Sequence, residues 1–152
     1  MFGSKTYPAT FPSPTAVSLR VANVRRAAEF YQKIGFTFVM AVPDDSDEWL
    51  LCLLRHGSGS ILLGAIDDPK FPRTSRLRRL RRPITLTVPD IAATYAACIA
   101  AGCSIAADPV REVWGDRTFS CRDPFGYDWS FTQTTERLTF QELLQTAKAA
   151  WS

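Results

Sequence analysis

The chain has 152 residues, of which 46% are hydrophobic and 12% aromatic, so it can form one packed domain or two small modules that share a core. Its formal net charge of +3 is too small to indicate nucleic-acid binding by itself. No apolar run approaches the roughly 20 residues of a membrane span, and residues 1–14 lack the apolar centre of a signal peptide. We therefore expect a cytoplasmic protein and expect neither a membrane nor a nucleic-acid partner.

The sequence contains an internal repeat. In each copy an alternating strand is followed by a helical pattern that stops at a glycine, and the matched positions keep one constant offset. The matched pairs are Val21 with Val88, Asn23 with Asp90, and Gly35 with Gly102. Asn23 and Asp90 are typical helix N-caps, and the two glycines are typical helix stops. A repeat of this length predicts two copies of one supersecondary unit.

In the first copy, Val17, Leu19 and Val21 point to one side of a strand, and Ser18 and Arg20 to the other. The helix that follows has a predicted buried face, which consists of Val24, Ala27, Ala28, Tyr31 and Ile34. Further strands are expected over residues 36–42, 49–54 and 60–66, separated by turns over 43–47 and 56–59.

In the second copy, Ile84, Leu86 and Val88 oppose Thr85 and Thr87. The expected buried face of its helix consists of Ile91, Thr94, Tyr95, Cys98 and Ile99. Strands are expected over 104–107, 117–122 and 127–133, with a loop through Trp114 before the second of them. Thr139 and Glu142 form a capping box that starts a C-terminal helix.

These elements predict an α+β fold in one domain over residues 1–152. It consists of a βαβββ module over 15–66, a connector over 67–82, a second βαβββ module over 83–134 and a helix over 139–151. The connector holds six arginines between Arg73 and Arg82. Such a run is either a solvated linker or a rim that attracts anions, and both interpretations stay open.

Residues 114–131 contain an aromatic in a loop, a strand, the turn Asp123-Pro124-Phe125-Gly126 and a second strand. Asp, Pro and Gly are the residues that tight turns require. Together with the βαβββ repeat, this hairpin resembles the vicinal-oxygen-chelate superfamily, which includes glyoxalases, bleomycin-resistance proteins and dioxygenases. The resemblance covers roughly residues 15–134. It implies two modules that pair their sheets into an incomplete barrel, a ligand site on the concave face, and a homodimer.

Metalloenzymes of that superfamily carry metal ligands at positions that correspond here to Ala16, Pro83 and Ser130, with Leu63 as the repeat partner of Ser130. None of these side chains is a good divalent-metal ligand. The single histidine, His56, lies in an expected turn, where a surface role is the usual one. We therefore expect no metal and no cofactor at the superfamily's usual site.

The four cysteines are Cys52, Cys98, Cys103 and Cys121, and no two of them form a CxxC pair. Three of them lie in apolar or strand-like surroundings, which favours buried, reduced thiols over a redox or metal-binding role.

The resemblance is closest to metal-free bleomycin-resistance proteins, which bind a drug in a dimer crevice with aromatic side chains. Trp114 matches the tryptophan of that crevice. Strand parity adds Ser18, Arg20, Thr87, Asp128 and Ser130 to the concave face, while Trp129 and Phe131 are expected in the core. Further ligand candidates are Trp49, Phe38, Met40 and Phe119. Residues 7–14, rich in proline, are either an arm exchanged across the dimer or a frayed tail.

Three functions follow from these observations. The first is metal-independent sequestration of a planar aromatic antibiotic or related natural product, neutral or mildly acidic because the protein carries a net positive charge. The second is a vicinal-oxygen-chelate enzyme, such as a lyase, isomerase or dioxygenase. The third is an accessory protein that recruits a polyanion through the arginine connector. We favour the first, since the positions of the usual metal ligands lack histidine and carboxylate.

Overall fold

The computed structural model describes residues 16–57, 59–66, 83–135 and 138–152. The chain divides into two compact units, Met1–Arg73 and Thr74–Ser152, each of which contains one module. The proline-rich arm over 7–14 and the arginine connector over 67–82 lie outside the described residues. None of the helices in the described ranges has the length and apolar character needed to cross a bilayer.

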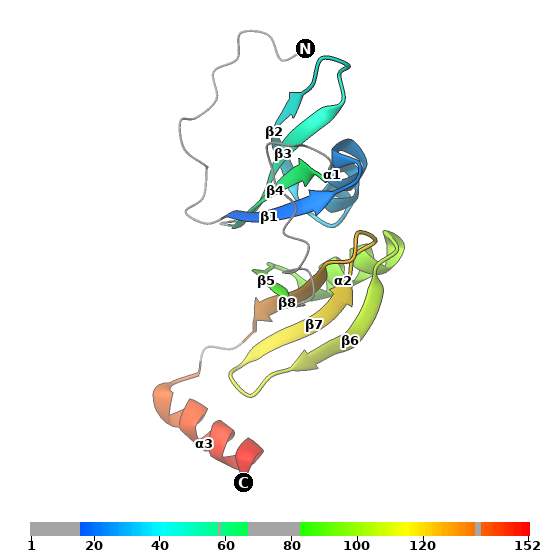
Figure 1. The fold of residues 1–152 in the computed structure, drawn as a ribbon. Coiled ribbons are helices and arrows are strands. Elements are labelled where there is room, and N and C mark those ends of the chain that lie inside the picture. The colour runs from blue at the N-terminus through cyan, green and yellow to red at the C-terminus, as the bar shows by residue number, and fades with distance from the viewer. Residues whose placement is uncertain (1–15, 58, 67–82, 136–137) are drawn as a thin grey trace. The chain divides into compact units, whose positions relative to one another are not determined.

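The first module has the predicted β-α-β-β-β order. Its elements are β1 (Ala16–Val21), α1 (Val24–Lys33), β2 (Thr37–Pro43), β3 (Trp49–His56) and β4 (Gly59–Ala65). The strands form one sheet in the order β1-β4-β3-β2, in which β1 runs parallel to β4 and the other neighbours are antiparallel. Helix α1 covers one face of this sheet (Figure 1).

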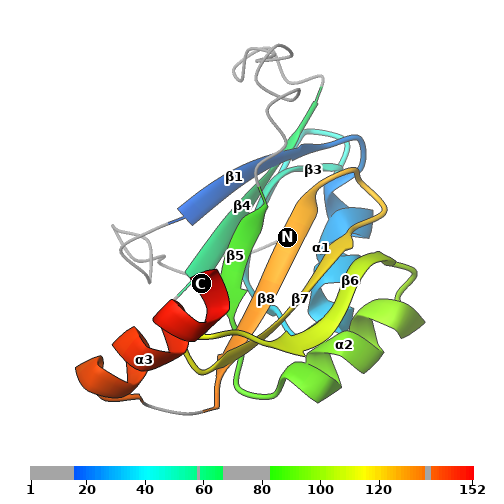
Figure 2. The same ribbon diagram turned by 90° about the horizontal axis from the view of Figure 1, so that it is seen from below.

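The second module repeats this order and the same sheet topology. Its elements are β5 (Ile84–Thr87), α2 (Ile91–Ala100), β6 (Ser104–Arg111), β7 (Asp116–Arg122) and β8 (Asp128–Thr134). The strand order is β5-β8-β7-β6, with β5 parallel to β8. Helix α2 packs against β6, β7 and β8 on one face of the sheet (Figure 2). The predicted repeat and the α+β class are therefore confirmed.

Local signals place both module helices where the sequence predicts them. The Asn23 side chain accepts a hydrogen bond from the backbone N–H of Arg26, and Asp90 does the same for Ala93. Gly35 and Gly102 follow the two helices with backbone φ angles of +114° and +92°, which residues with a Cβ atom rarely adopt. The C-terminal helix α3 (Phe140–Trp151) begins with the predicted capping box between Thr139 and Glu142.

The core of the first module lies between α1 and its sheet. The predicted helix residues Val24, Ala27, Ala28, Tyr31 and Ile34 are all buried. They meet a row of cross-strand neighbours that consists of Leu19, Leu63, Cys52 and Ala41. These four side chains are at most 3% exposed. The alternation predicted for β1 therefore holds, with Leu19 and Val21 buried.

The core of the second module consists mainly of stacked aromatic rings. Trp129 and Phe131 are nearly parallel with centroids 5.7 Å apart, and Phe131 stacks on Phe119 at 5.1 Å. Tyr95 of α2 meets Phe119 edge-on. Trp129 and Phe131 are thus core residues, as predicted. Ile99, expected on the buried face of α2, is instead 51% exposed, because α2 turns Ile91, Thr94 and Cys98 toward the sheet.

The turn between β7 and β8 is held by one buried carboxylate. Asp123 Oδ1 accepts hydrogen bonds from the backbone N–H groups of Phe125 and Tyr127, at 2.9 and 3.0 Å. Its Oδ2 accepts from Trp129 Nε1 at 2.9 Å. Gly126 completes the turn with φ of +91°. Asp123 therefore couples the turn geometry to the position of the core tryptophan.

Asp123→Ala should destabilise the protein by about 2–4 kcal/mol, because it leaves a buried indole N–H and two turn amides without their acceptor. Chemical denaturation monitored by circular dichroism would measure the change. Asp45→Ala, in an exposed turn of the first module, is the matched control and should change stability by less than about 0.5 kcal/mol. Equal stability of the two variants would contradict the role assigned to Asp123.

Candidate functional site

The sheet of the second module has one face turned away from α2, which we call its helix-free face. Register pairing places two rows of hydroxyl side chains there. The first row consists of Thr85, Ser130 and Ser120, and the second of Thr87, Thr132 and Thr118. All six are exposed or half-buried. The predicted placement of Thr87 and Ser130 on one face of the sheet agrees with this pairing.

Charged groups flank these hydroxyl rows at both ends. At one end Arg122 and Asp128, which face each other across β7 and β8, form a two-pronged ion pair with contacts of 2.7 and 3.3 Å. At the other end the Thr118 hydroxyl donates to Glu112 at 2.7 Å, and the Thr132 hydroxyl to Asp116 at 3.4 Å. Asp128 is therefore on the expected face but engaged by Arg122, and this ion pair raises the pKa of Arg122.

Trp114 lies at the carboxylate end of the same face. Its indole N–H donates to Asp116 Oδ2 at 3.0 Å, the oxygen that also accepts from Thr132. Gly115, with φ of +94°, turns the chain between Trp114 and β7. The Trp114 side chain is nevertheless 48% exposed. The structure thus presents a tethered indole whose ring remains open to solvent.

Three further predicted residues lie on the helix-free face of the first module. Ser18 is in one cross-strand row with Leu62, Leu53 and Met40, and Arg20 is in the next row, opposite Gly64. The guanidinium of Arg20 lies across Gly64 and donates to the carbonyl of Ala65 at 2.9 Å. Because Gly64 has no side chain, the long arginine can lie flat on the sheet.

The ligand candidates Phe38 and Trp49 lie on the other face of that sheet, away from Arg20 and Met40. Their rings contact each other at 5.6 Å, and Arg25 of α1 lies 4.5 Å from the Trp49 ring. Irregularities in the β2–β3 register between Phe38 and Met40, and again between Val42 and Pro43, break the simple alternation. These bulges turn both aromatic side chains toward the helix.

Phe119, expected as a ligand candidate, lies in the core instead. It is 1% exposed and packed between Phe131 and Tyr95, so it belongs to the core under α2 and does not face a ligand.

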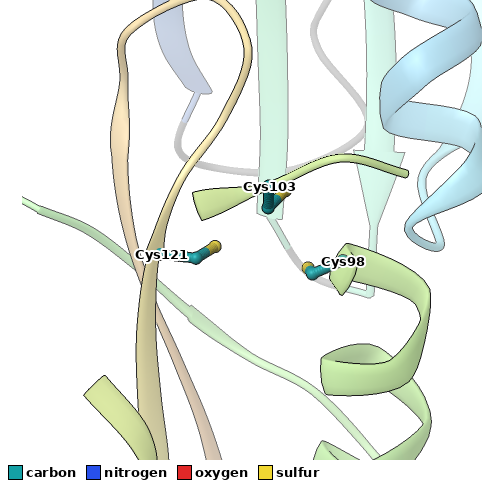
Figure 3. Close-up of side chains that lie close together, drawn as sticks. All are labelled: Cys98, Cys103 and Cys121. Carbon is teal, nitrogen blue, oxygen red and sulfur yellow. The ribbon is translucent and has the colours of Figure 1, made fainter. Parts of the chain in front are cut away.

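The sequence analysis did not find a cluster of three cysteines in the second module. Cys98 lies in the last turn of α2, Cys103 precedes β6 and Cys121 lies in β7. Their Sγ atoms all lie within 4.8 Å of one another. In Figure 3 the three side chains converge from these separate elements. Cys98 and Cys121 are buried and Cys103 is half-buried. No short spacing motif signals such a cluster, because it requires the packing of α2 on β7.

The three thiols have different acidities. Hydrogen bonds donated by Cys121 and Cys98 to the sulfur of Cys103 lower the pKa of Cys103 to about 4. The same contacts raise the pKa of Cys121 to about 12, chiefly through Cys103, and raise that of Cys98. Cys103 is therefore the thiol that ionises first. Cys52, in the first module, has its pKa raised to about 12 by burial alone.

The family model described as the Glyoxalase/Bleomycin resistance protein/Dioxygenase superfamily matches residues 14–131. The chain belongs to this superfamily. Curated proteins of the mycobacteria also match, among them an uncharacterized protein of Mycobacterium tuberculosis strain H37Rv, 33% identical over 63 residues. That match covers 40% of this chain and 37% of the relative. The chain thus spans about two fifths of the length of the curated relatives it matches.

Solved structures show the same fold at low sequence identity. TioX from Micromonospora sp. ML1 is 21% identical with a TM-score of 0.68, and the match covers 80% of this chain and 98% of TioX. UcmS2 is 20% identical with a TM-score of 0.61, covering 81% and 98%. A glyoxalase/bleomycin resistance protein/dioxygenase family enzyme from Burkholderia phytofirmans PsJN is 15% identical with a TM-score of 0.60, covering 80% and 98%.

Residues at the expected metal-ligand positions of the superfamily lie on both sheets. Ser130 lies on the helix-free face of β8, and Ala16 begins β1. Leu63 is not the structural counterpart of Ser130, since its side chain lies under α1; the counterpart is Leu62, which faces Ser18 as Ser130 faces Thr85. The constant offset of the repeat therefore changes by one residue before β4. Both Leu62 and Leu63 are leucines, so no metal-binding side chain is expected at this position whichever of the two is the counterpart of Ser130.

His56 is the last residue of β3 and is half-buried, not part of an exposed turn as expected. Its ring packs edge-on against Phe36, with the ring centroids 5.2 Å apart. A Cβ atom on Gly35 would lie only 3.0 Å from His56 Nε2, so the imidazole also packs closely against Gly35. Burial disfavours the charged imidazolium and lowers the pKa of His56 below 6.5.

Stability should therefore decline below neutral pH. The unfolded chain takes up a proton near pH 6.5, whereas folded His56 resists it, so the stabilisation is complete above that pH and is lost as the pH falls toward the lowered value. Urea midpoints measured between pH 7 and pH 5 would test this. His56→Phe, which preserves an edge contact to Phe36, should show a shallower decline; an unchanged slope would contradict the assignment.

Cys103 should be the first cysteine alkylated in metal-free, reduced protein. Because the hydrogen bonds from Cys121 and Cys98 lower the pKa of Cys103, its rate with iodoacetamide should change less between pH 6 and pH 8 than the rate of an ordinary thiol. An ordinary thiol, with a pKa near 8.5, would react roughly a hundredfold more slowly at the lower pH. Peptide mass spectrometry measures the site and the rate, and buried Cys52 is the internal control. A rate that rises steeply with pH would contradict the lowered pKa.

Proposed function

We propose that this protein binds and sequesters a planar aromatic small molecule, of the antibiotic or natural-product kind, without a metal ion at the superfamily's usual ligand positions. The observation that carries the proposal is Trp114, a half-exposed indole fixed by Asp116 beside two rows of hydroxyl groups. An exposed aromatic whose edge is held by a hydrogen bond is a ready stacking platform, since little side-chain freedom is lost when a ligand binds.

The polar groups next to Trp114 define what such a ligand should carry. The hydroxyls of Thr87, Ser130 and Thr85 can each donate or accept, and they lie in regular cross-strand rows. Asp116 accepts from the indole N–H, and Glu112 accepts from the Thr118 hydroxyl at the same end of the face. A neutral ring system with hydroxyl or amide substituents fits this surface, whereas a strongly anionic group near Trp114 would meet two carboxylates.

Binding without turnover is supported by the residue types at the family's metal positions. Ala16, Pro83 and Ser130 supply neither imidazole nor carboxylate, the groups that a divalent ion requires at such a site. Among the residues placed on the helix-free face of the second module, the carboxylate of Asp128 is paired with Arg122 and so is poorly suited to act as a general base.

We also infer the setting in which the protein acts. The superfamily resemblance supports a single domain over residues 1–152 and a homodimer. We infer a cytoplasmic location from the sequence alone.

Tryptophan fluorescence of the purified protein, titrated with planar aromatic natural products, tests the proposal. Saturable quenching at one ligand per site is expected, unchanged by EDTA, with the ligand recovered intact. Trp114→Ala should weaken binding about tenfold to thirtyfold, since loss of a stacking anchor costs roughly 1.4–2 kcal/mol.

Trp151→Ala is the matched control. Trp151 is 80% exposed in α3, outside the proposed site, so this variant should bind as the unaltered protein does. Binding abolished by EDTA, or conversion of the ligand to a product, would contradict sequestration and favour the enzyme interpretation. If the two tryptophan variants weakened ligand binding equally, the assignment of the site to Trp114 would be wrong.

A further inference from the structure

The cluster of Cys98, Cys103 and Cys121 lies on the opposite side of the sheet from the proposed ligand face. Cys121 is in register with Trp129 and Ile105 on the α2 side of β7, whereas its neighbours Ser120 and Arg122 point the other way. Its chemistry is therefore separate from that of the hydroxyl rows, and the inference below does not depend on the proposed function.

The backbone brings the three sulfurs together. The N–H of Cys103 donates to the carbonyl of Cys98 at 2.9 Å, across the helix stop at Gly102. The β6–β7 ladder then sets Cys121 opposite Ile105, two residues along the chain from Cys103. Helix end and ladder hold the sulfurs in place, so much of the ordering that a metal site needs is already done in the metal-free fold.

The spacing of the sulfurs suits a thiolate-bound ion. With metal–sulfur bonds of about 2.3 Å, sulfurs around a tetrahedral zinc ion lie about 3.8 Å apart. The three Sγ atoms lie within 4.8 Å of one another, so side-chain adjustments of under about 1 Å would complete the geometry. Rotation about χ1 supplies movements of that size without displacing the backbone.

Burial and ligand type limit which ion fits. Cys98 and Cys121 are 0% and 2% exposed, so two of the sulfurs are shielded from solvent. Half-buried Cys103 leaves an edge through which an ion can enter and a fourth ligand, such as water, can bind. Three thiolates select soft or borderline ions such as Zn²⁺ and Cd²⁺ over Mg²⁺ and Ca²⁺.

We propose that Cys98, Cys103 and Cys121 form a tri-thiolate site for a thiophilic divalent cation, with Zn²⁺ as the physiological ion. Binding displaces the remaining thiol protons and ties the end of α2 to β7. The ion stabilises the second module from its core side and takes no part in holding the ligand proposed for the opposite face.

Titration of reduced, metal-free protein with Co²⁺ is the test, because thiolate-to-cobalt charge-transfer absorption reports the number of sulfur ligands. One equivalent per chain is expected, with the intensity of three thiolates and tetrahedral ligand-field bands, followed by displacement on addition of Zn²⁺. Zn²⁺ should also raise the melting temperature, since an ion that binds only the folded state stabilises it.

Cys103→Ser should lower the cobalt affinity by at least about tenfold, because even the partners of metal ligands contribute that much. Cys103 is half-buried at the start of a strand, so the variant should fold, and circular dichroism verifies this. Cys52→Ser, which removes the cysteine of the other module, should keep full stoichiometry and intensity. Should Cys103→Ser fold poorly, native mass spectrometry of the unaltered protein with one bound Zn²⁺ gives an independent readout.

The proposal is overturned if the reduced protein shows no saturable sulfur-to-cobalt band, or if the Cys52 and Cys103 variants bind alike. Formation of a disulfide between two of the three cysteines in air, with no metal binding by the reduced protein, would also overturn it in favour of a redox pair. Ligand quenching at Trp114 is measured separately, so failure of the metal site and failure of the proposed function are distinguishable.

Discussion

The alternation of side chains along β7 and β8 fixes which groups of the second module meet α2 and which meet solvent. Phe119, Cys121, Trp129 and Phe131 point to the helix, and their neighbours Thr118, Ser120, Ser130 and Thr132 point away from it. Because the side-chain period of a strand is two, a slip of one residue would exchange these sets. Both the hydroxyl rows and the cysteine cluster depend on this register.

Asp123 secures that register. Its carboxylate closes the turn through two backbone amides and also holds the indole of Trp129, which alternation places in the core. A turn residue is usually replaceable, but this one links the turn to the largest fully buried side chain of the module. The half-buried ion pair of Arg122 with Asp128 lies on the next residue pair and orients the two strands more than it stabilises them.

The two modules share a topology but present different helix-free faces. In the second module that face carries rows of threonine and serine with Trp114 at one end. In the first it carries Met40, Leu53 and Leu62, with Arg20 lying flat over Gly64. The two modules therefore have the same topology but different side chains on their helix-free faces. Trp114, which Asp116 holds by a hydrogen bond, belongs to the second module.

The sequence by itself determined the two modules, their helix caps and stops, the capping box of α3 and the core positions of Trp129 and Phe131. These features rest on interactions within a few residues, or on strict alternation, and both are readable from one segment of chain. Strand parity also placed Ser18 and Arg20 on one face of the first sheet, and Thr87, Asp128 and Ser130 on one face of the second, in agreement with the register.

Only the tertiary structure decided the rest. Bulges in the β2–β3 pairing moved Phe38 and Trp49 to the helix side, and a one-residue change in the repeat made Leu62, not Leu63, the counterpart of Ser130. The cluster of Cys98, Cys103 and Cys121 required the end of α2 to meet β7. Strand register and helix packing join residues that are distant in the chain, and no local pattern contains that information.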